Sequence, residues 1–164
     1  MVNVMKRMGK SEKGFTLIEL LAVIVILGVI SAIAIPLIGG VINKSKTDSD
    51  LATARQIYEA TRLYVTAELN SDYKTKLSTQ PTTDTDLIIT IAELQAKGYL
   101  ESPIYLPSNK EAITGGQVSF DDATGKLYYV SVSTSPSLTA GKYYLGTDVI
   151  ATNSKATAAA GLHP

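Results

Sequence analysis

Hydrophobic residues are distributed unevenly along this chain of 164 residues, and one long apolar run dominates its first quarter. The run extends from Phe15 to Ile42 and contains a single charged residue, Glu19. About 20 apolar residues in a helix span the roughly 30 Å hydrocarbon core of a bilayer. The pattern therefore predicts a membrane-spanning helix. Glu19 then needs a polar partner, because a carboxylate inside such a helix is costly, and we find none for it nearby in the run.

Residues 43–70 keep helical spacing but mix apolar and charged positions. No proline interrupts the chain between Pro36 and Pro81, so the helix is expected to continue. One broad stripe at helical spacing comprises Leu51, Ala54, Ile57, Tyr58, Thr61, Tyr64 and Val65. The charged residues lie mostly on the other side, namely Asp48, Asp50, Arg55, Glu59, Arg62 and Glu68. This pattern predicts an amphipathic helix that packs one face on a core.

A polar loop over residues 71–86 separates the long helix from a second, shorter one. Thr90 and Glu93 have the spacing of a capping box, in which each residue satisfies a free backbone group of the helix start. Gly98 suits the position just after a helix end. The sequence therefore predicts a short helix over residues 91–97.

The last third of the chain is rich in β-forming residues. After a loop at 102–107, a strand around Val118 and Phe120, a turn at 121–125 and a strand at 126–132 predict a hairpin. A further strand is expected at 142–150. We therefore predict an α+β fold, with a long N-terminal helix packed on an antiparallel sheet of three or four strands.

The sequence Gly-Phe-Thr-Leu-Ile-Glu, which starts at Gly14 and precedes the apolar run, resembles the N-terminus of a type IV pilin or pseudopilin. The resemblance covers roughly residues 10–36. It implies that a prepilin peptidase cleaves between Gly14 and Phe15 and methylates the new amine of Phe15. It also implies that Glu19 pairs with the Phe15 amine of a neighbouring subunit during assembly.

This resemblance divides the chain into a leader at 1–14, a transmembrane and assembly helix at 15–42, and a globular head at 43–164. Four basic residues before the apolar run predict that this side is cytoplasmic: Lys6, Arg7, Lys10 and Lys13. Removing the leader takes away these four and one acid, and leaves 11 Lys and Arg against 14 Asp and Glu. Bulk electrostatic attraction to nucleic acid is therefore not indicated, although a local contact with DNA stays open.

Gly28 and Pro36 lie inside the predicted membrane helix. Proline removes one helical hydrogen bond, and glycine lowers local helix stability, so both residues predict a kink or loosening. In assembled type IV pili the segment between such residues is often partly unwound. The alternative is that both residues are simply tolerated, as they are in many membrane helices.

Residues that would carry catalysis are scarce. The chain has no cysteine, and its one histidine, His163, is next to last, so we expect neither a catalytic set nor a zinc site. The glycines at 115–116 lack the Gly-Lys-Ser/Thr continuation of a phosphate loop. Many pilins hold their C-terminal region with a disulfide, and its absence here is compatible with a Gram-positive source.

Two further motifs could indicate a calcium site and a glycosylation site, but a turn and solvated surface explain them better. A calcium site needs six to eight oxygens, so a hairpin turn explains the local acids better than a metal does: Asp121, Asp122 and Asp148. The glycosylation triplet at residues 43–45 is short, and we interpret it as solvated surface. We predict no cofactor and no metal.

The leading functional hypothesis is a structural subunit of a type IV pilus filament that supports adhesion, twitching motility or DNA uptake. The expected partners are further copies of the chain, the prepilin peptidase, the pilus assembly platform with its ATPases, and the cytoplasmic membrane before export to an extracellular filament. The alternative is a pseudopilin of a type II secretion or competence system. Two other classes fit the sequence less well. A membrane-anchored binding module that never polymerises would have no use for the charge of Glu19, and a secreted enzyme would need a set of catalytic residues that the sequence does not show.

Overall fold

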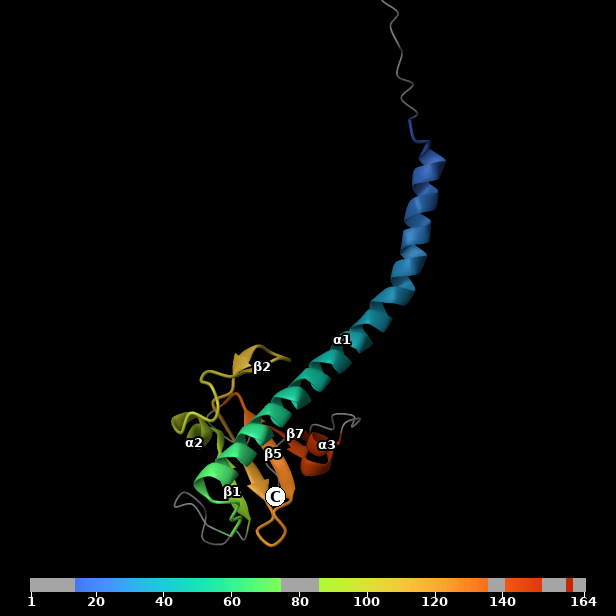
Figure 1. The fold of residues 1–164 in the computed structure, drawn as a ribbon. Helices are drawn as coiled ribbons and strands as arrows, with labels where there is room; N and C mark the ends of the chain where they lie inside the picture. Colours follow the sequence, from blue (N-terminus) through green and yellow to red (C-terminus); the bar gives the residue numbers. More distant parts are fainter. Residues whose placement is uncertain (1–13, 75–85, 136–140, 152–158, 161–164) are drawn as a thin grey trace, which may run out of the picture. The chain divides into compact units, whose positions relative to one another are not determined.

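The computed structural model describes residues 14–74, 86–135 and 141–151, and the backbone of 159–160. It divides into two compact units, one that ends at Val41 and one that begins at Ile42. The first helix, α1, runs from Leu17 to Glu68 and contributes to both units (Figure 1).

The second unit contains a five-stranded antiparallel sheet in the order β1-β4-β5-β6-β7. Its strands are β1 (Leu87–Thr90), β4 (Gly115–Phe120), β5 (Leu127–Ser133), β6 (Lys142–Leu145) and β7 (Ala159–Ala160). A separate hairpin and two short helices complete the unit: β2 (Tyr105–Leu106), β3 (Glu111–Ala112), α2 (Ile91–Ala96) and α3 (Gly146–Ile150). The predicted α+β class is confirmed. Four strands form the main sheet, and the two-residue β7 extends it.

The core of the second unit lies between α1 and the sheet. The predicted stripe on α1 is confirmed at nearly every position, with Leu51, Ile57 and Val65 fully buried and Tyr58 half-buried. Asp50 was assigned by its charge to the solvent side, and this was wrong. Its side chain is only 1% exposed, because it accepts hydrogen bonds from groups far along the chain, as described below.

Two local predictions are confirmed by their capping and turn geometry. Helix α2 starts after Thr90, whose side chain accepts a hydrogen bond from the Glu93 N–H at 3.2 Å. The Glu93 carboxylate does not complete the box, since it accepts instead from the hydroxyl of Tyr64 on α1. Strands β4 and β5 form the predicted hairpin, and Gly125 takes a positive φ of 66° in the turn.

The predicted strand at 142–150 was only half right, because β6 ends at Leu145 and the chain continues as the helix α3. At this point Gly146 lies tightly against β5, where a Cβ atom would meet the carbonyl oxygen of Leu127 at 2.0 Å. Strand β1 and the β2–β3 hairpin were not predicted, and β2 occupies part of the expected loop at 102–107. The predicted loop at 71–86 falls largely outside the described residues.

Candidate processing and assembly site

The segment before α1 is non-helical and exposed. Gly14, Phe15 and Thr16 have no helical structure, and all three are exposed. A Cβ atom added to Gly14 would find nothing within 4 Å, so nothing among the described residues covers this backbone. The bond between Gly14 and Phe15 is therefore accessible to a protease.

Thr16 and Glu19 form a complete capping box at the start of α1. The backbone N–H and the hydroxyl of Thr16 both donate to Oε2 of Glu19, each at 2.9 Å. The Glu19 N–H donates in return to the Thr16 hydroxyl oxygen at 3.3 Å. The expectation that Glu19 lacks a nearby partner was wrong. The spacing Thr-x-x-Glu carries the signal that identified the cap of α2 and could have identified this one.

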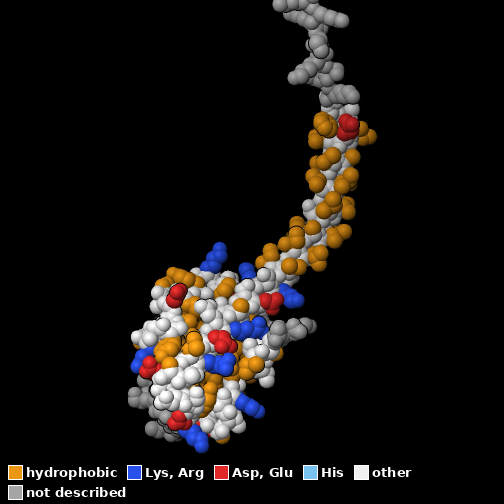
Figure 2. Space-filling view, viewed as in Figure 1, with side chains coloured by type: hydrophobic (Ala, Val, Ile, Leu, Met, Phe, Trp, Pro, Cys, Tyr) orange, Lys and Arg blue, Asp and Glu red, His pale blue; other side chains and the backbone are white. Residues whose placement is uncertain are grey.

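The first unit exposes its apolar side chains on all sides. Every large hydrophobic residue that the structure describes in this unit is at least 49% exposed. Figure 2 shows hydrophobic side chains along this part of α1. Its most apolar window of 18 residues has a mean hydropathy of 3.0, and none of that window is buried. A core helix of a globular protein would be mostly buried. The apolar surface of this part of α1 therefore requires lipid or other chains to shield it from water.

Helix α1 runs through Gly28 and Pro36 as an unbroken α-helix in the single chain. No atom lies within 4 Å of a Cβ placed on Gly28. Because the predicted unwinding concerns the assembled state, it stays a prediction.

A comparison with protein-family models matches residues 9–35 to the prokaryotic N-terminal methylation motif. This motif is the type IV prepilin signature. The matched residues include Gly14, Phe15 and Glu19, so the exposed segment before α1 and the capping box both lie inside the signature. No solved structure matches the chain.

The prepilin signature supports a type IV pilin or pseudopilin family member. It implies processing by a peptidase and assembly into a pilus, and together with the apolar helix it fits membrane anchoring before assembly. Proteins of this kind are structural rather than enzymatic.

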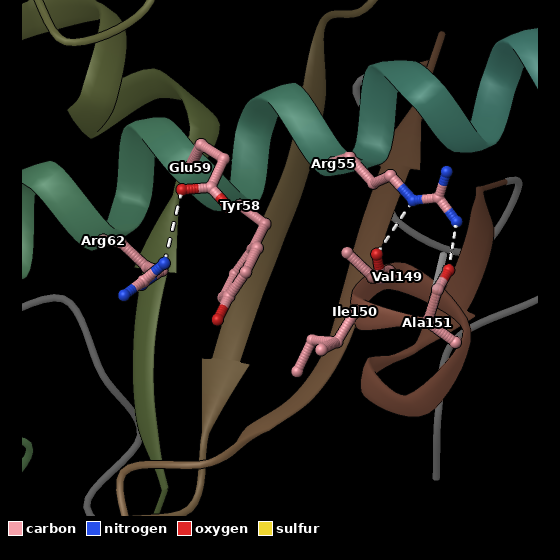
Figure 3. Close-up of a pocket in the computed structure, with 7 residues that line it drawn as sticks. All are labelled: Arg55, Tyr58, Glu59, Arg62, Val149, Ile150 and Ala151. Atoms are coloured by element: carbon pink, nitrogen blue, oxygen red, sulfur yellow. Dashed lines mark hydrogen bonds and ion pairs between the residues drawn. The ribbon is translucent and has the colours of Figure 1, made fainter. Parts of the chain in front are cut away.

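In the head, Arg55 fastens α3 to α1 (Figure 3). Its Nε donates to the carbonyl of Val149 at 2.9 Å, and its Nη2 donates to the carbonyls of Ala151 at 2.6 Å and Asp148 at 3.3 Å. The last carbonyls of a helix have no partners within the helix, so the guanidinium caps α3. No local pattern in the sequence predicts this role, since the partners lie more than 90 residues from Arg55.

A second long-range contact joins α1 to the β2–β3 hairpin and β6. The buried carboxylate of Asp50 accepts from the Ser108 N–H at 2.9 Å and from the Lys142 ammonium at 2.8 Å. The same ammonium donates to the Ser108 hydroxyl at 3.2 Å. Tyr144 is fully buried beside this cluster, and burial, followed by the negative charge of Asp50, raises its pKa.

Of the acids considered for calcium, Asp121 serves the β4–β5 turn, whereas Asp148 lies in α3. The Asp121 carboxylate accepts from the hydroxyl and the N–H of Thr124, each at 2.7 Å, and these bonds lower the pKa of Asp121. Among the residues that the structure describes, no group of three or more potential metal ligands occurs. His163 lies outside them.

Proposed function

We propose that this chain is a structural subunit of a type IV pilus filament, built by packing its apolar helix against the same helix of other copies. The observation that carries the proposal is the pairing of the prepilin signature with a helix whose apolar surface the chain itself leaves uncovered. A lipid bilayer covers that surface before assembly, and neighbouring helices cover it afterwards.

In this proposal the peptidase cleaves between Gly14 and Phe15 and methylates the amine of Phe15. N-terminal sequencing of the membrane and filament forms tests the step, and a mature chain that begins elsewhere would refute it. Gly14→Ala should be processed better than Gly14→Leu, because the open backbone at Gly14 suits close approach by an enzyme.

After cleavage, the Phe15 amine of an incoming subunit meets the carboxylate of Glu19 on a docked one. Both groups are costly to leave unpaired where water is excluded, and losing one partner of a buried pair costs about 3–5 kcal/mol. We therefore expect Glu19→Ala to be inserted and cleaved but to enter filaments poorly. Immunoblots of the membrane and sheared-surface fractions measure this.

Glu19→Gln is the matched variant, because its amide oxygen still accepts from Thr16 while the charge is lost. If the charge drives assembly, Glu19→Gln should fail as Glu19→Ala does. Normal filaments from Glu19→Gln would mean that Glu19 acts only as a helix cap. Normal filaments from Glu19→Ala, with no wild-type copy present, would remove Glu19 from assembly altogether.

Electron microscopy of sheared surface material separates the pilus from the alternative pseudopilus. Long surface filaments that bind antibody to the head support the pilus. Short fibres confined to the cell envelope, together with a secretion or DNA-uptake defect on deletion, would support the pseudopilin instead.

A further inference from the structure

The head carries a cluster of lysines near the start of its segment of α1. Asp50 lies at the centre of this cluster, because its carboxylate binds Lys142 on β6 and the Ser108 N–H of the β2–β3 hairpin. The unit begins at Ile42, which is the last residue of the apolar run. From Ile42 to Asp50 the helix rises by about 12 Å at 1.5 Å per residue. Figure 1 shows β2 beside this part of α1.

Two lysines around Asp50 are available to an external anion. Lys46 is one helical turn before Asp50 and lies on the same face of α1, the face that carries the hairpin. Lys110 lies in the turn of the hairpin, two residues after Ser108. Both lysines are exposed, and neither ammonium group forms an ion pair or a hydrogen bond with the residues that the structure describes. We call Lys46, Lys110 and Lys142 together the basic shoulder.

The backbone at Lys110 indicates that its side chain has a role. Lys110 adopts the left-handed conformation with a φ of 61°, and its N–H closes the turn by donating to the Leu106 carbonyl at 2.8 Å. This conformation costs a residue with a Cβ atom about 1–2 kcal/mol, whereas glycine adopts it freely. A lysine is therefore an unfavourable choice for the turn itself, and its ammonium group is the feature that glycine would lack.

The carboxylates on the same elements leave the shoulder with a surplus of cations. Asp50 is paired with Lys142 at 2.8 Å, and Glu111 on β3 accepts from the Asn109 amide at 2.7 Å. Asp48 is two residues from Asp50, so it lies on the other side of α1. The shoulder therefore has three lysines against two carboxylates, and both carboxylates already have donors.

The apolar run places lipid headgroups close to the shoulder. From Phe15 to Ile42 the run is about 42 Å long as a helix. A bilayer has a hydrocarbon core of about 30 Å and measures about 40–45 Å with both headgroup layers. Ile42 is then at the outer edge of the headgroup layer when Phe15 is at the inner edge. The remaining rise of about 12 Å is comparable to the Debye length of roughly 8–10 Å, so the lysines are attracted to the phosphates.

We propose that the basic shoulder docks on the phosphate groups of the outer lipid leaflet before assembly, with Lys46 and Lys110 as the contacts. Lys142 positions the hairpin through Asp50 and Ser108, which keeps the two contacting lysines on one side of α1. Docking holds the head against the membrane, and it strengthens as the share of anionic lipid rises. The inference concerns the membrane form of the chain and does not require that the chain builds filaments.

The absence of cysteine allows a fluorophore to be placed at one site in the full chain. Tyr105→Cys marks the hairpin and Ala123→Cys marks the β4–β5 turn, and both positions are exposed. The turn is at the other end of the head, since Gly125 lies against Tyr73, beyond the last residue of α1. In vesicles of phosphatidylcholine and phosphatidylglycerol that contain a lipid with a nitroxide on its headgroup, we expect strong quenching of the hairpin label and weak quenching of the turn label.

Lys46→Gln combined with Lys110→Gln removes both contacts. Each lysine near an anionic surface favours binding by roughly fivefold, so the ratio of docked to undocked heads should fall about 25-fold. Lys74→Gln with Lys126→Gln is the matched control, because it removes the same charge from exposed positions beside Tyr73 and Gly125. The control should leave the quenching unchanged. Added salt should weaken the quenching of the hairpin label in a chain with all its lysines.

Quenching of the hairpin label that is no stronger than that of the turn label would overturn the inference, as would quenching that survives Lys46→Gln with Lys110→Gln. Equal losses in the control pair would also overturn it, since net charge alone would explain them. If the double variant instead loses binding of duplex DNA in neutral detergent and keeps its lipid quenching, the shoulder binds nucleic acid and the lipid assignment is wrong. Filament assembly is a separate measurement, so an absence of filaments would refute the proposed function and leave this result unaffected.

Discussion

The contact between Asp50 and Lys142 offers the sharpest test of how the head is held together. Asp50 is 1% exposed, whereas the Lys142 side chain is 41% exposed, and their charged atoms are 2.8 Å apart. Lys142→Met removes the cation and leaves the buried carboxylate with the Ser108 N–H as its one donor among the described residues. Breaking a buried ion pair costs about 3–5 kcal/mol, and water can approach Lys142, so we expect a loss of about 3 kcal/mol.

Asp50→Asn is the matched variant. Its side-chain oxygen can still accept from Ser108, and the Lys142 ammonium can turn toward solvent. The expected loss is about 1 kcal/mol, the net worth of a typical hydrogen bond. The double variant should be more stable than Lys142→Met alone, because it leaves no buried charge without a partner.

Urea unfolding followed by near-ultraviolet circular dichroism measures both effects. All nine tyrosines lie at or after Tyr58, so the aromatic signal reports the head and not the membrane helix. With a urea m-value of about 1–3 kcal/mol/M, a loss of 3 kcal/mol lowers the midpoint by roughly 1–3 M. A Lys142→Met midpoint equal to that of the wild type, or strictly additive losses in the double variant, would show that Lys142 does not compensate Asp50.

Three further predictions concern the head. Gly146→Ala should cost about 1–3 kcal/mol in thermal melts, because its Cβ would press on the rigid Leu127 carbonyl, and an unchanged melt would contradict this close packing. The isolated segment 43–164 should fold as a soluble monomer with cooperative unfolding by circular dichroism, whereas aggregation would mean that the core needs neighbours. Burial, followed by the hydrogen bond to Glu93, raises the pKa of Tyr64 from 10.0 to about 12. The associated stability is complete below pH 10 and is lost as the pH rises toward 12. A spectrophotometric titration should lose one step near pH 12 in Tyr64→Phe, and an unaltered titration would refute the assignment.

Local patterns predicted the parts of the fold that local contacts determine. The buried stripe on α1, the Thr90 cap of α2 and the β4–β5 turn each depend on residues within a few positions of one another. The three signals are helical spacing, a capping box and a turn sequence, and each is recognised from residues that lie close together in the chain. For the same reason the α+β class followed from the sequence.

The features that the sequence did not reveal depend on distant partners. Asp50 is buried because its partners Ser108 and Lys142 lie 58 and 92 positions away. Helix α3 occupies the second half of the predicted strand at 142–150. Its Val149 carbonyl accepts a hydrogen bond from Arg55, which lies 94 positions away. No periodicity near either site contains this information. The Thr16–Glu19 cap is a different case, because its signal was local.

The capping box also clarifies how Glu19 can serve the single chain and the filament at once. Both hydrogen bonds from Thr16 converge on Oε2, and Oε1 receives none from the described residues. In the bilayer the cap gives the carboxylate local donors, which lowers the cost of holding it near the end of an apolar helix. The free Oε1 can then accept the Phe15 amine of an incoming subunit without disturbing the cap. The cap and the proposed pairing between subunits therefore need not compete, and Glu19→Gln is informative because it preserves the first and removes the charge from the second.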